Sequence, residues 1–246
     1  QPRSRGLGDV YKRQLLLLGF FLNAQNLKSP DNNLDLNFSI DEKGRAFYSL
    51  NFHEKPVILN SGLGFMLKDN VEWMKIDTLD MMNNFKILNV TFDSVDEYWN
   101  PVWGEESEIR NNYNEMFVEL QQIESERKVN IRLRLFDDSL GFRYEFPLQE
   151  KLGSFIIIDE KTEFAMAGDH TAMWIPGDYD TQEYNYTTSK LSEIEQKSIE
   201  FKEENVSMYR FSNWAVQTAL MMKSQNGLYI NIHEAALIEY SAMHLE

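Results

Sequence analysis

The segment best suited to bind a metal ion is Asp178-Tyr179-Asp180-Thr181-Gln182-Glu183, which places three carboxylates within six residues. Hard cations such as Ca2+ take several oxygen ligands at about 2.3–2.6 Å, and a carboxylate cluster supplies such ligands. The spacing is not that of an EF-hand loop, because the sixth position is Glu183 instead of glycine. Taken alone, the segment is more typical of an acidic turn than of a metal site.

A second segment with binding chemistry is residues 99–106, WNPVWGEE, in which two tryptophans flank a proline and two carboxylates follow. Aromatic rings stack on the apolar faces of sugars, and carboxylates accept hydrogen bonds from sugar hydroxyls. Tryptophan is also a common anchor of a hydrophobic core. The residues alone favour the core role for Trp99 and Trp103 over contact with a sugar.

Motifs of several common enzyme classes are absent from the chain. It contains no G-x-S-x-G elbow, phosphate-binding Walker loop, Rossmann glycine fingerprint or H-E-x-x-H zinc helix. His233 and Glu234 begin like the zinc motif but lack the second histidine, so we interpret them as a polar pair at a strand end. The absence of cysteine excludes disulfides, thiolate metal sites and a cysteine nucleophile.

The charge of the chain limits its partners. The 246 residues include 24 basic and 39 acidic side chains, for a net charge of −15. Nucleic acids and anionic lipid surfaces attract clustered Lys and Arg, so we expect neither a nucleic acid nor a membrane anchor as a partner.

The elements that must position these residues are strands. Apolar residues alternate with polar ones at a period of two, which predicts half-buried strands. The predicted strands are residues 34–40, 47–52, 85–92 with a bulge between Ile87 and Val90, 116–120, 129–135, 142–146, 155–158, 216–222 and 228–232. The continuous apolar run at 155–158 predicts a strand covered on both faces, and residues 191–199 predict a short surface helix. The fold class is therefore all-β, a large antiparallel sandwich with few short helices.

The two ends of the chain are expected to differ from a complete mature protein. Residues 1–14 resemble translated adaptor sequence and are expected not to belong to the protein. Residues 15–25 resemble part of a signal peptide, with cleavage after Ala24, which indicates an exported, periplasmic protein; the alternative is a buried N-terminal strand. Residues 26–246 read as one domain. The chain stops within a patterned segment, so we expect a truncated domain of a longer protein.

Several motifs together resemble glycoside hydrolase family 97. They occur in order from about Gln25 to the last residue and are SPDNNL at 29–34, PVWGE at 101–105, IRN at 109–111, YNE at 113–115, GFRYEFP at 141–147, WIPGDYDTQEY at 174–184 and HEAAL at 233–237. The resemblance covers the N-terminal β-super-sandwich of that family, a galactose-mutarotase-like fold. It implies that the catalytic (β/α)8 barrel and the C-terminal β domain are absent from this chain.

The resemblance implies an inverting α-glucosidase that acts on α-gluco-oligosaccharides and needs Ca2+. Its catalytic glutamates lie on the barrel, so none of the catalytic residues is expected in this chain, which completes the active site of the barrel. The family motif assigns one calcium ligand to Glu183, and a later loop approaching the sugar corresponds to Glu204, Asn205 and Val206. Two alternatives stay open: a stand-alone carbohydrate-binding sandwich, and the N-terminal domain of a retaining α-galactosidase of the same family.

Overall fold

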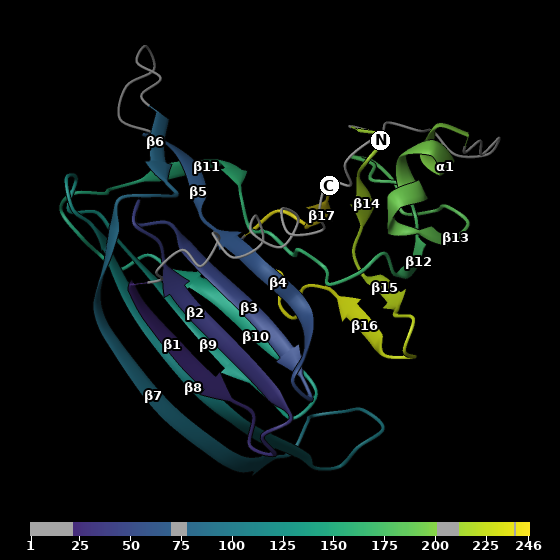
Figure 1. Ribbon diagram of the computed structural model, residues 1–246, viewed down its shortest axis with the longest axis horizontal. Coiled ribbons are helices and arrows are strands. Elements are labelled where there is room, and N and C mark those ends of the chain that lie inside the picture. The colour runs from purple at the N-terminus through teal and green to yellow at the C-terminus, as the bar shows by residue number, and fades with distance from the viewer. Residues whose placement is uncertain (1–21, 70–77, 201–211, 239) are drawn as a thin grey trace, which may run out of the picture. The chain divides into compact units, whose positions relative to one another are not determined.

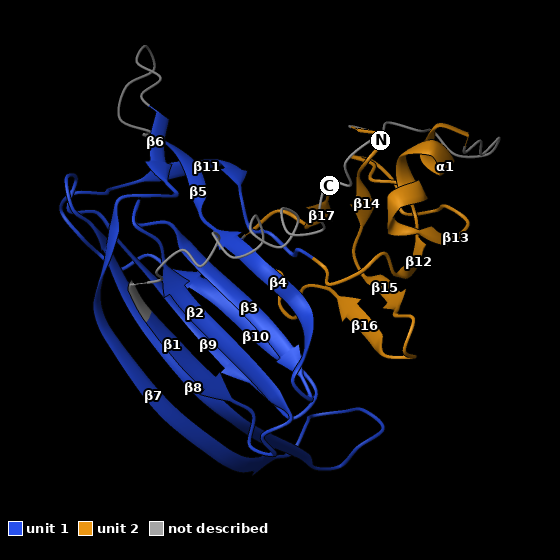
Figure 2. Cartoon of the chain, viewed as in Figure 1, with its two compact units in different colours: residues 1–165 blue, residues 166–246 orange. Residues whose placement is uncertain are grey.

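The computed structural model describes residues 22–69, 78–200, 212–238 and 240–246. The chain divides into two compact units, residues 1–165 and 166–246 (Figure 2). The single domain expected over residues 26–246 thus contains two compact units. No helix of the described ranges has the length and apolar character needed to cross a membrane.

The described residues of the first unit form three antiparallel sheets (Figure 1). The first sheet has the order β1-β2-β3-β4, with strands β1 (Leu22–Lys28), β2 (Leu34–Ile40), β3 (Ala46–Phe52) and β4 (Lys55–Leu63). The second has the order β10-β9-β8-β7, with β7 (Phe85–Trp99), β8 (Ile109–Gln122), β9 (Lys128–Leu135) and β10 (Leu140–Glu145). The third, β11-β5-β6, consists of β5 (Phe65–Asp69), β6 (Thr78–Met81) and β11 (Phe155–Glu160).

The apolar residues of the alternating pattern form the core of this unit. Apolar side chains of the first and second sheets are fully buried, among them Leu36, Phe38, Tyr48, Met116, Ile131 and Leu133. The rings of Tyr48 in β3 and Phe142 in β10 lie 5.6 Å apart, so the two sheets pack face to face. The Tyr48 hydroxyl donates to the Glu163 carbonyl at 2.7 Å, which satisfies its polar end. The predicted all-β sandwich is confirmed.

The turn between β2 and β3 depends on a glycine. Gly44 has a positive φ of 69° and its N–H donates to the Asp41 carbonyl at 2.9 Å. A Cβ atom at this position would lie 2.4 Å from the backbone nitrogen of Phe85, so only glycine allows the turn to approach the start of β7.

The second sheet ends in a long, uncovered strand. β7 has 15 residues and pairs with β8 on one side; among the described residues no strand pairs with its other side. The register shift between Ile87 and Asn89 confirms the predicted bulge. The sequence predicted the strand only to Phe92, and its extension to Trp99 forms a long hairpin with β8.

The second unit is smaller and carries the helical residues. Its main sheet has the order β13-β12-β15-β16, with β12 (Thr171–Trp174), β13 (Thr187–Lys190), β15 (Leu220–Lys223) and β16 (Tyr229–Ile232). A second pair joins β14 (Val216–Gln217) to β17 (His244–Leu245). The 3-10 helix η1 (Leu191–Glu193) and helix α1 (Ile194–Glu200) confirm the predicted surface helix.

Two strand predictions need correction. The strand expected at residues 216–222 is divided into β14 and β15, which belong to different sheets. The run in β11 was expected to be covered on both faces, but Ile156 and Ile158 are 46% and 49% exposed. β11 is an edge strand with one face on the core, so its alternate residues reach the surface of this chain.

Candidate functional site

The acidic segment forms a loop between neighbouring strands of the second unit. β12 ends at Trp174 and β13 begins at Thr187, and these two residues face each other in the sheet. The Trp174 side chain is fully buried and its indole N–H donates to the Ser189 hydroxyl at 3.0 Å. This buried bond fixes the base of the loop, residues 175–186, to β13.

Asp178 organises the interior of this loop. One oxygen of its buried carboxylate accepts the backbone N–H groups of Asp180 at 2.8 Å and Thr181 at 3.2 Å. The other oxygen accepts the hydroxyl of Tyr184 at 2.6 Å. This is the Asx-turn chemistry of an acidic turn, so for Asp178 the turn interpretation is correct.

The strand β14 holds the loop from a second side. The side-chain amide of buried Gln217 donates to the carbonyls of Pro176 at 2.9 Å and Thr181 at 2.8 Å. The N–H of Gly177 donates to the carbonyl of Ala215 at 2.8 Å. The Oε1 atom of Gln217 is buried and has no hydrogen-bond partner among the described residues. Nothing in the sequence pattern distinguished Gln217 from an ordinary strand residue.

Glu183 has a different environment from Asp178. Its side chain is exposed, and its backbone N–H donates to the Thr181 hydroxyl at 3.1 Å. Its carboxylate forms no hydrogen bond or ion pair with another described residue and can therefore supply one oxygen ligand to a cation. Within the described ranges, no three His, Asp or Glu side chains are grouped to hold a metal ion. The described residues alone therefore do not form a complete metal site, and Glu183 could supply at most one ligand.

Exposed aromatic side chains lie on and beside this loop. Tyr179 and Tyr186 belong to the loop and are 66% and 67% exposed. Trp214, which is 60% exposed, directly precedes the Ala215 that accepts from Gly177. Rings of this kind beside a carboxylate are suited to sugar contact. Only their residue type could have indicated these three positions from the sequence.

Two further segments were candidates for sugar contact. Glu204, Asn205 and Val206 lie outside the described residues. The aromatic segment at 99–106 belongs to the first unit, at the end of the β7–β8 hairpin. The core role favoured for its tryptophans is wrong for Trp103, which is 88% exposed, and Trp99 is half exposed. Trp174 fills the core role instead.

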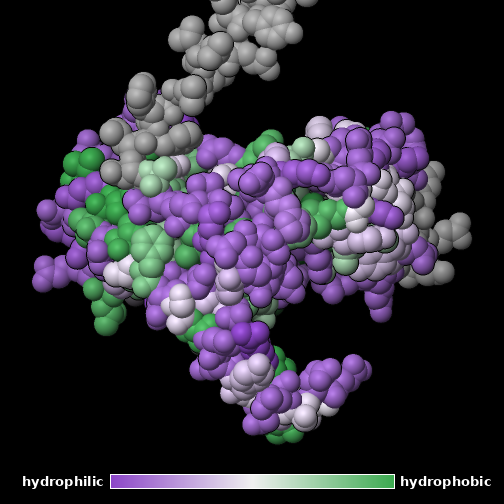
Figure 3. All heavy atoms as spheres, turned by 60° about the horizontal axis from the view of Figure 1, so that its bottom comes forward, coloured by the Kyte–Doolittle hydropathy of each residue, from purple (hydrophilic) through white to green (hydrophobic). Residues whose placement is uncertain are grey.

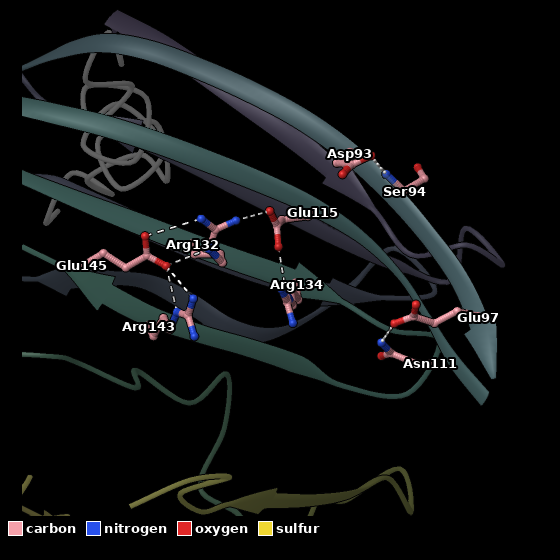
Figure 4. A network of polar contacts seen from close by, with 9 residues as sticks. All are labelled: Asp93, Ser94, Glu97, Asn111, Glu115, Arg132, Arg134, Arg143 and Glu145. Carbon is pink, nitrogen blue, oxygen red and sulfur yellow. Dashed lines mark hydrogen bonds and ion pairs between the residues drawn. The ribbon is translucent and has the colours of Figure 1, made fainter. Parts of the chain in front are cut away.

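A network of carboxylates and guanidinium groups on β8, β9 and β10 is structural (Figure 4). Glu115 accepts from Arg132 and, at 2.8 Å, from Arg134, while Glu145 accepts from Arg132 at 2.8 Å. The Arg132 guanidinium holds the pKa of Glu145 below its usual value, and Arg143 acts in the same direction. A carboxyl whose pKa is lowered by ion pairs, as that of Glu145 is, makes a poor general acid near neutral pH.

Comparison with known proteins agrees with this architecture. The glycosyl-hydrolase 97 N-terminal family model matches residues 27–246. The chain is 23% identical over 231 residues to the retaining alpha-galactosidase of Bacteroides thetaiotaomicron, covering 89% of this chain and 30% of that protein.

The chain is also similar to solved structures of glycoside hydrolase family 97 enzymes. A glycoside hydrolase family 97 enzyme from Pseudoalteromonas sp. strain K8 is 32% identical, with a TM-score of 0.74 for its acarbose complex and 0.72 for a variant in complex with panose. Each match covers 89% of this chain and 30% of that enzyme. A beta-arabinopyranosidase at 18% identity and a TM-score of 0.68 shares the fold. The chain spans about 30% of the length of these relatives, and it belongs to glycoside hydrolase family 97 as an N-terminal domain.

Proposed function

We propose that this chain is the N-terminal domain of an exported, calcium-dependent α-glucosidase that cleaves α-gluco-oligosaccharides with inversion. Its role is to complete the active site of a catalytic barrel that lies outside these 246 residues. The observation that carries the proposal is Glu183, an exposed carboxylate without a partner among the described residues, on a loop fixed by Asp178 and Gln217. A ligand held ready in this way loses little conformational entropy when a cation binds.

Support for glucose over galactose comes from the relatives. Identity is 32% to the enzyme solved with panose and acarbose, against 23% to the retaining alpha-galactosidase, over the same share of this chain. Panose is a trisaccharide of α-linked glucose. The higher identity favours a glucoside as the substrate of the whole enzyme.

In this mechanism the residues of the chain bind and orient, and the reacting carboxylates belong to the barrel. Glu183 is the calcium ligand of this domain, and Glu204, Asn205 and Val206 are the residues proposed to contact the sugar. A bound calcium ion would supply positive charge that stabilises negative charge on a substrate oxygen. Asp178 and Gln217 hold the Glu183 loop in place through hydrogen bonds, and the exposed ring of Tyr179 offers a stacking surface for sugar.

The proposal is tested by titrating the activity of the full-length enzyme with calcium. Glu183→Gln keeps the shape of the side chain and one oxygen but removes its charge, so calcium affinity is expected to fall at least about tenfold. Turnover should fall with it and return in part at high calcium. Asp180→Asn, on the same loop, is the matched control and should leave the curve unchanged. Superimposable curves for wild type and Glu183→Gln would refute the metal role.

The retaining α-galactosidase branch is the second candidate, supported by the match to the Bacteroides thetaiotaomicron enzyme. Comparing aryl α-glucoside with aryl α-galactoside as substrates of the full-length enzyme separates the two. Following the anomer first released by NMR separates inversion from retention. Binding of glycan by the 246-residue chain alone, without a barrel encoded after it, would instead favour a stand-alone carbohydrate-binding sandwich.

A further inference from the structure

An open cleft of about 620 Å3 lies at one edge of the first unit. β1 and β7 are the outermost strands of the first and second sheets, and the cleft lies between these two strands. Its volume is within the range of small-molecule sites, about 300–1,000 Å3. The lining residues are Asn26, Leu27 and Lys28 of β1, Phe92, Asp93 and Ser94 of β7, and Asn114 of β8.

Phe92 supplies an aromatic ring that the core leaves uncovered. It pairs across the hairpin with the fully buried Met116, and directly paired residues lie on the same face of a sheet. Phe92 is nevertheless 53% exposed, whereas Leu27 on the opposite strand is buried. The face drawn in Figure 3 has hydrophobic residues at several separate places, so an exposed ring alone does not identify a site. The polar groups around Phe92 decide what the cleft can bind.

A chain of hydrogen bonds fixes the two sides of the cleft. The Ser94 hydroxyl donates to the side-chain oxygen of Asn114 at 2.7 Å, and the Asn114 amide donates to the Lys28 carbonyl at 2.8 Å. The first bond joins β7 to β8, and the second joins β8 to the end of β1. The cleft therefore has its shape before a ligand arrives, which lowers the entropic cost of binding.

Acceptor oxygens on both edge strands remain available to a ligand. The Asn26 amide donates to Asp35 and, at 3.1 Å, to Asn37, which orients the side chain, while its oxygen accepts from no described residue. One oxygen of Asp93 accepts the Ser94 N–H at 2.8 Å, and the other has no partner in the described part of the chain. Figure 4 shows Asp93 and Ser94 on β7, apart from the arginine network.

These groups favour a neutral sugar as the ligand. The Phe92 ring suits the apolar face of a sugar, the oxygens of Asn26 and Asp93 accept from hydroxyls, and the Lys28 ammonium donates. Lys28 and Asp93 are the charged lining residues and have opposite signs, so the cleft does not select a strongly charged ligand. A peptide strand would need apolar recesses for alternate side chains, and of the lining residues only Phe92 and Leu27 are apolar.

We propose that this cleft binds a short oligosaccharide of α-linked glucose. Residues of the first unit alone form the site, whereas the Glu183 loop belongs to the second unit. A glucan held there stays near the enzyme, which raises the local concentration of substrate. The proposal rests on the proposed function for the identity of the sugar. Another part of the protein, or a second copy of it, is the competing occupant.

The first measurement is hydrogen–deuterium exchange of the full-length enzyme with and without millimolar acarbose, read by mass spectrometry. Acarbose is the glucan analogue with which the Pseudoalteromonas enzyme was solved. A bound sugar covers the open sides of β1 and β7, so peptides spanning residues 22–28 and 88–95 should exchange at least about threefold more slowly. Exchange that acarbose leaves unchanged overturns the proposal, because the cleft then either stays empty or is already covered.

The second measurement repeats the exchange with variants at the ring. Phe92→Ala should remove most of the protection of β1 and β7, whereas Phe92→Trp keeps an aromatic face and should retain it. Tyr229→Ala removes a ring of similar exposure, 59%, from β16 and is the matched control, with protection unchanged. Unchanged exchange of β2 and β9 shows that each variant is folded. Protection that survives Phe92→Ala overturns the proposal, because acarbose would then be acting from elsewhere.

The sugar site and the proposed function fail separately. Protection of β1 and β7 by acarbose, in an enzyme that cleaves aryl α-galactosides but not aryl α-glucosides, would refute the proposed function and support the site. α-Glucosidase activity without protection of these strands would refute the site and leave the proposed function intact.

Discussion

Asp178 and Glu183 lie in the same loop but differ in burial. Asp178 is 3% exposed, and both of its carboxylate oxygens accept hydrogen bonds within the loop. Glu183 is exposed, and its carboxylate forms no hydrogen bond with another described residue. The sequence could indicate the acidic cluster but not this division, because it depends on which side chain the loop folds around. The family resemblance, and not the spacing, selected Glu183.

Asp178→Ala should weaken calcium binding even though Asp178 is not proposed as a ligand. The change removes the acceptor of two backbone N–H groups and one hydroxyl, which should lower stability by about 2–3 kcal/mol and release the loop that presents Glu183. Thermal unfolding and calcium titration of the full-length enzyme measure the two effects. Asp178→Asn keeps one acceptor oxygen and should show less of both; equal effects would mean that charge, not loop order, is the cause.

His170 should make stability depend on pH. It is 7% exposed, and burial lowers its pKa below the usual 6.5, with the positive charge of Lys190 acting in the same direction and Asp169 opposing. The unfolded chain then binds more protons than the folded one as pH falls through about 6.5, so stability is lost in that direction.

The expected result is a thermal midpoint that declines from pH 7 to pH 5. His170→Gln removes the titrating group, so its midpoint should decline less over this range. Parallel profiles for the two proteins would show that His170 does not contribute. Carboxylates contribute mainly at lower pH, because the Asp169 carboxyl, for example, has its pKa lowered by hydrogen bonds from Ser192.

At the scale of elements, ion pairs on the outer face of the second sheet stabilise it in addition to its apolar core. The guanidinium carbons of Arg132 and Arg134 lie 4.4 and 4.5 Å from the ring centres of Phe117 and Tyr113. Both arginines donate to Glu115 (Figure 4). Contact with the rings helps to hold the two guanidinium groups beside the carboxylate.

Glu115→Gln should therefore destabilise the chain although it changes only a few atoms. The amide that replaces the carboxylate removes the negative charge between the two arginines and presents a donor to one of them, at a cost of about 2 kcal/mol after allowance for the partial exposure of the arginines. Urea unfolding measures the loss. Glu119→Gln, at a half-buried position on the same strand, keeps an acceptor oxygen for Asn89 and is the control; it should change stability by less than about 0.5 kcal/mol.

The strands were predictable because their pattern is local. The predicted limits of the strand at residues 34–40 match β2, and the bulge in β7 was visible as a phase slip. The extension of β7 to Trp99 was missed because Asp93, Ser94, Asp96 and Glu97 interrupt the apolar alternation. Those residues are exposed and pair across the hairpin with β8, and such a non-local interaction leaves no period in the sequence.

At the scale of the whole molecule, the chain should hydrolyse nothing by itself. A general acid and a general base must both flank the scissile bond, and the carboxylates of the Arg132 network are neutralised by ion pairs. Purified 246-residue protein should show no turnover of maltose or an aryl α-glucoside, with or without calcium. Turnover that disappears when a residue of this chain is mutated would place catalysis here.

The open side of β7 has a further consequence for the isolated domain. A long strand whose outer side pairs with no other strand in the described part of the chain is a template onto which another chain can add a strand, and repetition of that step produces fibrils. Asp93 and Glu97 act as gatekeepers, since two such edges brought together would oppose like charges, and the ion pair of Asp96 with Arg110 adds further charged groups beside the edge. Arg110 lowers the pKa of Asp96 and keeps that charge in moderately acidic solution. The charges that make β7 look unlike a strand in the sequence are thus what protects this edge from self-assembly.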